Sequence, residues 1–327
     1  MVRTTKFSTS EIPDLTGKVA IVTGTSPGGI GAETARQLAI AGAKVYLAAR
    51  NEEKNKKTLE EIQSKAPEGK TLKLELLKLD LADLAAVRQA ADDFKAREER
   101  LDICVLNAGI MACPKDITKD GWEIQFQANY LGHFLFTKEL LPVLEAGAAA
   151  SGHPSRVISL SSIGHRAERL FPWASISFES REKVNRTFGP SVMGNFLRYS
   201  QAKLADLLFA REWNRRIGRP GGGKVMAASV HPGVIKSNLY IYTPGASLIG
   251  PTMLPTADGA LSSLYVATNA ELETEASWDV YRGDYGLQHT DSTTSKNVQL
   301  ASDLWELSED AVKDVTSATR TPKVPVA

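Results

Sequence analysis

Short runs of apolar and β-branched residues alternate with long amphipathic stretches along most of this chain. The short runs have the length of strands, and the stretches between them space their apolar residues as a helix does. This alternation predicts an α/β fold, a doubly wound parallel sheet with helices on both faces. The expected strands are 18–23, 44–49, 72–78, 101–106, 155–161 and 224–230, with a short further strand near Val280-Tyr281. The expected helices are 30–42, 52–65, 82–99, 120–145, 194–217 and 257–269.

The pattern contains no internal repeat and no sign of a second domain, so we expect a single domain over residues 17–314. Residues 1–16 are typical of a polar leader, and residues 315–327 of a disordered tail. Two internal segments look irregular, 164–193 and 237–256. Loops of that length in a compact domain are commonly functional lids or disordered.

The composition excludes several classes of partner. The 327 residues include 39 Lys and Arg against 38 Asp and Glu, so no surplus positive field attracts nucleic acid or an anionic membrane. No apolar run is long enough to span a bilayer, and the N-terminus lacks a hydrophobic signal core. The two cysteines have neither metal-ligand spacing nor a disulfide framework, and Cys104 is expected in the core. We therefore expect a cytoplasmic protein without a metal site, and leave a homo-oligomer open.

Chemically suggestive residues follow each of the six expected strands. In open doubly wound sheets the ligand lies at the carboxyl ends of the strands. The six clusters would thus meet at one edge of the sheet and form one site. They are the glycine-rich turn Thr23–Gly31, Arg50, Asp80, Asn107-Ala108-Gly109, Ser161-Ser162 and His231-Pro232-Gly233.

The glycine-rich turn links the first strand to a helix. Glycines let the backbone approach a pyrophosphate, and the helix N-terminus offers unpaired N–H groups and a positive dipole end. Its spacing, with Gly24, Gly28, Gly29 and Gly31, departs from the usual dinucleotide fingerprint. The alternative is a tight turn with no ligand.

Arg50 ends the second strand, where no acidic residue precedes Glu52. Dinucleotide folds that choose NAD place an acid there, whereas a basic residue accommodates the extra phosphate of NADP. NADP(H) is therefore the expected cofactor, and a solvated arginine is the alternative.

Asp80 either accepts a hydrogen bond from adenine or caps the following helix. Asn107-Ala108-Gly109 either lets the backbone pass close to the cofactor or forms a plain turn.

Tyr199 and Lys203 lie one turn apart on an expected helix and face the same way. An ammonium in that position stabilises a phenolate and is expected to lower the pKa of the tyrosine. Such a tyrosine exchanges a proton with an alcohol oxygen. The pair alone is weak evidence in a chain with eight tyrosines, and a partly buried tyrosine beside a solvated lysine is the alternative.

The glycine-rich turn, Asn-Ala-Gly, the serine pair and Tyr-x-x-x-Lys occur here in one order, and with them the chain resembles the short-chain dehydrogenase/reductase superfamily over about residues 16–310. Four segments resemble its retinol-dehydrogenase and WW-domain-oxidoreductase branch. They are Asn129–Phe134, Tyr199–Phe209, His231–Gly233 and Leu304–Glu309.

The resemblance implies a single-domain Rossmann fold and hydride transfer between NADP(H) and a carbonyl or alcohol of a small, apolar molecule. It implies the catalytic residues Asn129, Ser162, Tyr199 and Lys203, with Ser162 as the second of the serine pair. Ser237 replaces a threonine that contacts the nicotinamide amide in the family. The cofactor-binding residues expected in all are Gly24, Ser26, Gly28, Gly29, Ile30, Gly31, Arg50, Asp80, Leu81, Asn107, Ala108, Gly109, Tyr199, Lys203, Pro232, Gly233, Val234 and Ser237.

Two departures from the family pattern concern the glycine-rich turn and the segment before Tyr199. The turn is one residue longer than usual, and Pro27 has no N–H for a phosphate. The stretch of sequence between Ser162 and Tyr199 is also longer than is usual in the family, which indicates an added excursion over the active site. Apolar residues of the two irregular segments either line a substrate pocket or pack ordinarily: Phe171, Trp173, Tyr240, Tyr242, Met253 and Leu254. His165 either touches substrate or lies in a solvated loop.

Two other functions share the expected fold. One is a changed reaction, such as enone reduction, dehydration or epimerisation. The other is a regulatory protein that binds the cofactor without turnover, against which the intact set of catalytic residues argues.

Overall fold

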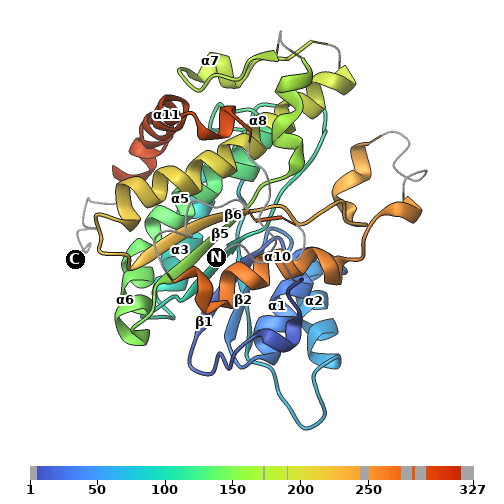
Figure 1. The fold of residues 1–327 in the computed structure, drawn as a ribbon, viewed down its shortest axis with the longest axis vertical. Helices are drawn as coiled ribbons and strands as arrows, with labels where there is room; N and C mark the ends of the chain where they lie inside the picture. The colour runs from blue at the N-terminus through green and yellow to red at the C-terminus, as the bar shows by residue number, and fades with distance from the viewer. Residues whose placement is uncertain are drawn as a thin grey trace, which may run out of the picture.

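A computed structural model describes residues 6–171, 174–189, 191–243, 250–273, 282–283 and 292–317. Its centre is a six-stranded parallel sheet in the order β3-β2-β1-β4-β5-β6 (Figure 1). The strands are β1 Val19–Thr23, β2 Lys44–Ala49, β3 Leu74–Lys78, β4 Ile103–Leu106, β5 Ser155–Leu160 and β6 Val225–Val230. All six expected strands are thus confirmed, with ends shifted by at most two residues. Val280 and Tyr281 lie outside the described residues, and Arg282 next to them forms a parallel bridge with Val230.

Alternating strand residues divide the core into two layers, as the pleat of a sheet requires. On one face, Ala20, Val45 and Ile158 belong to a cluster that includes residues of three helices. These are α1 Ile30–Ile40, α2 Glu52–Ser64 and α10 Thr256–Thr268. On the other face, Ile21 and Val157 belong to a second cluster with the remaining long helices. These are α3 Leu84–Lys95, α5 Gly132–Glu139, α6 Leu141–Ser151, α8 Ser191–Trp213 and α11 Val298–Ser317.

The expected helix over 120–145 is interrupted in the structure. A single turn, α4 Ile124–Phe126, leads into a π-helical turn over Gln127–Leu131 and then into α5. A new helix, α6, begins at Leu141 with Pro142 in its first turn. Proline is favoured there because its missing N–H would have no helical partner. Periodicity alone does not reveal the π turn, because one extra residue hardly changes the apolar pattern.

The chain order reverses between β1 and β4, which lie side by side although β2 and β3 intervene in sequence. The connections from β1 to β2 and β3 build one half of the sheet, and β4, β5 and β6 build the other. A ligand crevice forms at such a switch point, outside the carboxyl ends of the strands. The Thr23–Gly31 turn and the Asn107–Gly109 segment leave the sheet at this point.

Both ends of the described chain pack more closely than the sequence indicates. Phe7, in the expected polar leader, is buried and contacts Tyr265 of α10 with ring centroids 5.5 Å apart. At the other end α11 continues through Ser317, past the expected start of the tail at residue 315. Residues 318–327 lie outside the described part.

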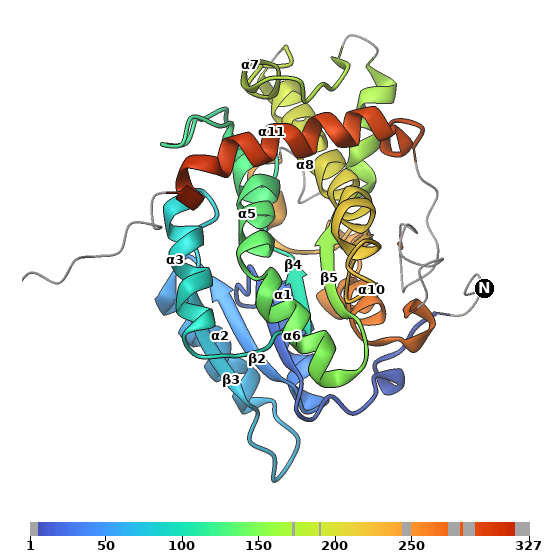
Figure 2. The same cartoon turned by 90° about the vertical axis from the view of Figure 1, so that its left-hand side faces the viewer.

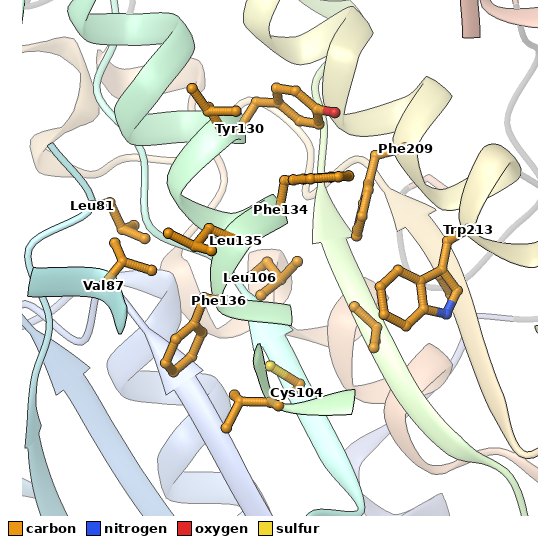
Figure 3. Packing of buried hydrophobic residues seen from close by; sticks show 14 of the residues in the cluster. Leu81, Val87, Cys104, Leu106, Tyr130, Phe134, Leu135, Phe136, Phe209 and Trp213 are labelled. Carbon is orange, nitrogen blue, oxygen red and sulfur yellow. The ribbon is translucent and has the colours of Figure 1, made fainter. Parts of the chain in front are cut away.

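Helix α11 lies across the outer side of α5 and α8 (Figure 2). Its Trp305 packs on Phe134, with ring centroids 5.1 Å apart, and stacks parallel to Phe209 at 6.5 Å. Phe134, Phe209 and Trp213 lie above Leu106 and Cys104 of the sheet (Figure 3). The burial of Cys104, expected from the sequence, is thereby confirmed, and burial raises the pKa of its thiol to about 12. The aromatic layer joins α11 to the helices that carry the site.

Part of the excursion over 164–193 packs into the core cluster that contains α5 and α8. Its short helix, α7 Arg181–Val184, and the residues before it place Phe178 and Val184 in the same cluster as α5 and α8. A smaller cluster joins Ala167, Ala174 and Phe188 to Leu197 of α8, with Phe171 packed against it. This excursion is therefore anchored to the domain by buried side chains.

Trp305→Ala should lower the free energy of unfolding by about 3–5 kcal/mol, because it removes a large buried ring from this aromatic layer. The measurement is equilibrium denaturation in urea. Val298→Ala on the same helix is the matched control, since Val298 is 65% exposed and such a change costs within about 0.5 kcal/mol. Equal midpoints for the two variants would show that α11 contributes nothing to the core.

Candidate active site and cofactor cleft

Hydrogen bonds join the chain after β1 to the chain after β4. The Asn107 side-chain amide donates to the carbonyl oxygens of Thr23, at 2.7 Å, and Gly24, at 3.2 Å. The Ala108 N–H donates to the Thr23 hydroxyl at 2.9 Å. A Cβ on Gly31 would lie 2.4 Å from the Asn107 amide nitrogen, and one on Gly24 would lie 2.6 Å from the Ala108 Cα. These two glycines are needed because the two segments approach so closely.

The glycine-rich turn presents the open end of α1. Gly29 is the N-cap residue and supplies no side-chain cap, so the first N–H groups of α1, from Ile30 onward, have no capping side chain. Gly28 has φ +66°, a left-handed conformation that glycine adopts without strain. Ser26 is exposed, whereas Thr25 beside it is buried and donates to Asn55 of α2 at 2.7 Å. This geometry fits a pyrophosphate at the end of α1.

Arg50 is exposed at the end of β2, and among the described residues no carboxylate pairs with it. Asn51 next to it caps α2 by accepting the Lys54 N–H at 2.8 Å. Asp80 is half-buried and accepts the Ala82 N–H at 3.0 Å in the turn before α3. The residue that caps α3 is Asp83, so the helix-capping alternative for Asp80 is wrong. Leu81 lies against α5, where a Cβ on Gly132 would meet the Leu81 carbonyl oxygen at 2.6 Å.

Tyr199 and Lys203 lie on α8, and both are buried, at 3% and 5% exposed. The Lys203 ammonium is 5.8 Å from the centroid of the Tyr199 ring. It donates to the Leu160 carbonyl oxygen at 2.6 Å and to the Asp206 carboxylate at 2.8 Å. Ser162, just after β5, favours the charged form of Tyr199 and accepts the Gly164 N–H at 3.1 Å. The structure thus brings together three of the four expected catalytic side chains.

Burial raises the pKa of Tyr199, and the opposing effects of Lys203 and Ser162 do not outweigh it. This direction is the reverse of the lowered pKa expected from the Tyr-Lys spacing. The spacing shows the ammonium but not the apolar wall around the phenol, which disfavours the charged form. Burial acts to lower the pKa of Lys203, but Asp206 and Tyr199 together more than compensate, and the net shift of the pKa is upward.

Asn129 lies in the π turn, and both the oxygen and the nitrogen of its side-chain amide hydrogen-bond to the Ile110 backbone. Its Oδ1 accepts the Ile110 N–H at 2.8 Å, and its Nδ2 donates to the Ile110 carbonyl oxygen at 2.9 Å. A Cβ on Gly109 would lie 3.4 Å from the Asn129 Oδ1 and 3.6 Å from the Lys203 Nζ. Asn129 therefore fixes the strand-end segment that passes beside Lys203.

His133 connects the π turn to the switch point. Its Nδ1 lies 2.7 Å from the Asn129 carbonyl oxygen, which only accepts, so Nδ1 carries the proton. Its Nε2 then accepts from the Thr23 hydroxyl at 2.9 Å. Burial lowers the pKa of His133 to about 3, in agreement with this neutral tautomer. The neutral imidazole thus joins the end of β1 to Asn129.

The segment after β6 lies beside the serine pair. The His231 Nδ1 accepts the Ile163 N–H at 3.4 Å. Gly233, after Pro232, has φ +94°, and the Val234 carbonyl oxygen accepts the Leu254 N–H at 2.9 Å. The Ser237 hydroxyl caps a short 3₁₀ helix over Asn238–Tyr242.

His165 is buried, so the expectation of a solvated loop histidine is wrong. Its Nδ1 is 2.6 Å from the Ser162 carbonyl oxygen, so it donates to that oxygen and holds the turn that presents Ser162. Only the buried position of this turn, which the sequence does not show, distinguishes this arrangement from a solvated loop.

An apolar wall surrounds Tyr199. Met111, Ala112 and Tyr199 form a buried cluster, with Phe196, Leu239 and Tyr240 packed against it. Tyr240 was considered from the sequence, whereas Met111 and Phe196 were missed. Phe196 is detectable in retrospect from its position, one helical turn before Tyr199. Phe171 packs elsewhere, Tyr242 is exposed, and Trp173 lies outside the described residues.

Among the described residues no group of three His, Cys, Asp or Glu side chains is placed to hold a metal ion. The helices described here also include none with the length and apolar character to cross a membrane.

Comparisons with known proteins agree with this geometry. A profile of the short chain dehydrogenase family matches residues 18–171. An uncharacterised oxidoreductase of Schizosaccharomyces pombe is 41% identical over 84% of this chain and 79% of its own length. Retinol dehydrogenase 11 of Mus musculus is 36% identical over 90% of this chain and 86% of its own.

A crystal structure of an uncharacterised protein from Mycobacterium Paratuberculosis superposes with a TM-score of 0.72 at 31% identity, covering 94% of this chain and 98% of that one. Sequence relatives and structure agree over nearly the whole domain. The chain therefore belongs to the short-chain dehydrogenase/reductase family, in its retinol-dehydrogenase-like branch, and is an oxidoreductase that acts on CH–OH or C=O groups.

Proposed function

We propose that this protein is an NADP(H)-dependent oxidoreductase that interconverts a carbonyl and an alcohol on a small apolar substrate. The observation that carries the proposal is the convergence of Ser162, Tyr199 and Lys203 at one buried point beside an apolar wall. Relatives named retinol dehydrogenases support an apolar alcohol or aldehyde as substrate. A cytoplasmic location and a homo-oligomeric assembly stay predictions.

The residues around the switch point fit a dinucleotide. The open end of α1 and the close approach at Gly24 and Gly31 leave backbone N–H groups for a pyrophosphate. The exposed Arg50 guanidinium at the end of β2 suits the 2′-phosphate of NADP. When bound, NADPH supplies the hydride. The remaining expected contacts follow β3, β4 and β6 at the same edge of the sheet: Asp80, Leu81, Asn107, Ala108, Gly109, Pro232, Gly233, Val234 and Ser237.

In the reducing direction, the Tyr199 hydroxyl gives its proton to the oxygen of the substrate carbonyl. Ser162 donates a hydrogen bond to the same oxygen, and each such donor contributes on the order of 10²- to 10³-fold in rate. The Lys203 ammonium stabilises the phenolate that remains on Tyr199. Met111, Phe196 and Tyr240 exclude water from this exchange. Asn129 holds the Ile110 backbone and so keeps Gly109 beside Lys203.

The proposal is tested by following the absorbance of NADPH with a panel of ketones, aldehydes, including retinal, and enones. Turnover of aldehydes or ketones supports it. Turnover of enones alone would indicate a changed reaction, and binding of NADPH without turnover of any compound would indicate a regulatory protein.

Tyr199→Phe removes only the hydroxyl, so kcat should fall by about 10²-fold or more, as loss of general-acid chemistry does. NADPH should bind with nearly unchanged affinity in a fluorescence titration. Tyr240→Phe is the matched control, because it removes a hydroxyl from the same wall and should retain most of the turnover. If Tyr199→Phe retains most of its activity, another group is the acid.

The raised pKa of Tyr199 predicts opposite pH dependences for the two directions. A phenol that stays protonated at neutral pH is a competent acid, so carbonyl reduction should hold its kcat through neutral pH and decline only in the basic range. Alcohol oxidation needs the phenolate and should rise with pH over that basic range. Initial rates in both directions over pH 6 to about 10.5 provide the measurement. A reduction rate that already falls as pH rises toward 7 would contradict a raised pKa.

Arg50→Asp should reverse the cofactor preference, measured as the ratio of kcat/KM for NADPH and NADH, because it removes the cation offered to the 2′-phosphate and adds an acid. Lys54→Asp is the control for the change in charge, since Lys54 is exposed in the first turn of α2 and should not alter the preference. If the wild-type protein has the same kcat/KM for NADH as for NADPH, Arg50 does not recognise the phosphate.

A further inference from the structure

Asp206 is a buried carboxylate at the active site to which the mechanism above gives no part. It lies on α8, three residues after Lys203, and is 2% exposed. Its Oδ2 is 2.8 Å from the Lys203 Nζ, and the Ser159 hydroxyl of β5 favours its ionised form. The sequence did not single out this residue. Its signal is the i, i+3 spacing from the lysine, which places both on one face of the helix.

The Lys203 ammonium has three N–H donors. One is directed at the Leu160 carbonyl oxygen and one at Asp206, at 2.6 and 2.8 Å. One acceptor lies at the end of β5 and the other on α8, so the two bonds together fix the position of the Lys203 Nζ. The third donor remains for the proposed substrate and cofactor cleft, since Lys203 lies beside Gly109 and Tyr199.

A buried ammonium without a counter-ion tends to lose its proton, because desolvation disfavours the charged form. The groups that act electrostatically on Asp206 or its partner are Lys203 and Tyr199 on α8, Tyr130 of the π turn, and the neutral His133 of α5. None of these is a second carboxylate. Among the described residues the negative charge beside Lys203 therefore comes from Asp206.

We propose that Asp206 is a positioning residue of the active site, whose carboxylate keeps Lys203 charged and holds its ammonium so that one donor faces the cleft. This inference rests on the proposed function for its effect on turnover, but the ion pair itself does not depend on that function. Asp206 touches neither substrate nor cofactor in this proposal and acts through Lys203.

The pair has a consequence at acid pH. Burial raises the pKa of Asp206 to about 6, with Lys203 and Ser159 opposing the rise. As pH falls through that value the carboxyl gains a proton and Lys203 loses its counter-ion. Lys203 keeps its own proton in this range but is no longer held by a charged partner. Because the ammonium is then less well positioned, wild-type kcat for reduction should decline as pH falls through about 6.

Asp206→Asn keeps the shape and removes the charge. The decline near pH 6 should be absent in this variant, because the titrating group is gone. In its place kcat should fall with rising pH above neutrality, where the wild type stays level, since the lone ammonium now loses its proton earlier. If the assay pH lies one unit above the new pKa of Lys203, only about a tenth of the enzyme keeps the ammonium, and kcat should be about tenfold lower.

Glu212→Gln is the matched control on the same helix. Glu212 is also a buried acid, but its partners are Arg215 and Arg216. The same chemical change there should leave the shape of the pH profile unchanged. A profile of Asp206→Asn that equals the wild-type profile multiplied by a constant would overturn the proposal.

A second measurement needs no turnover. A double-mutant cycle compares the free energies of unfolding of the wild type, Asp206→Asn, Lys203→Met and the double variant. Such a cycle isolates the interaction energy between the two side chains. Asp206→Asn should destabilise the protein markedly in the wild-type background and much less in the Lys203→Met background, whereas Glu212→Gln should cost the same in both backgrounds. Additive effects of the two substitutions would overturn the proposal. Coupling without turnover of any carbonyl would instead refute the proposed function and retain the ion pair.

If Asp206→Asn does not fold, Ser159→Ala tests the same inference with both charges in place. The Ser159 hydroxyl favours the ionised carboxylate, so its removal should move the acid decline of kcat to higher pH. An unmoved decline would show that Asp206 is not the group that titrates.

Discussion

The structure depends on the hydrogen bonds that join the ends of β1 and β4. Parallel strands that are neighbours in the sheet but distant in sequence diverge after their last paired residues, and here Asn107 and Ala108 hold the two segments together through Thr23 and Gly24. The contact is so close that side chains at Gly24 and Gly31 would collide with it. This constraint sets the position of α1, and with it the open helix end that suits a pyrophosphate.

The same constraint extends to Asn129 and Lys203 through a neutral histidine. Thr23 is bonded both to Ala108 and to His133, and His133 is bonded to the Asn129 carbonyl oxygen. The π turn around Asn129 directs its side chain at Ile110, so the segment after β4 is held from both ends. Such widened turns often occur at functional sites, where they redirect a side chain at the cost of regular helix geometry. Here the turn places Gly109 beside Lys203.

The sequence predicts the sheet well because each strand is a short apolar run with clear boundaries, and the edge that carries the site follows from the topology of parallel sheets. It does not predict α11, whose Trp305 packs against residues more than 90 positions away. It also predicts the wrong direction for the pKa of Tyr199, because the spacing to Lys203 is local whereas the apolar wall comes from Met111, Leu239 and Tyr240. Asp206 was missed for a different reason, since an acid three residues after a lysine is more often a solvated pair on a helix surface.

The long excursion before Tyr199 contributes to the site through a buried ion pair. Arg198, next to Tyr199, lies 3.2 Å from Glu123, and the two side chains are 1% and 0% exposed. Arg198 also donates to the Thr187 carbonyl oxygen at 2.8 Å, while Asn185 accepts the Glu123 N–H at 2.8 Å.

The excursion, the start of α4 and the residue before Tyr199 are thus joined in one polar network. Breaking such a pair leaves an uncompensated buried charge and costs about 3–5 kcal/mol, far more than a solvent-exposed pair would. The excursion is therefore part of the framework of α8. It fixes the stretch of α8 from which Tyr199 and, one turn later, Lys203 project, so the segment that is hardest to interpret from sequence also helps to set the geometry of the most recognisable motif.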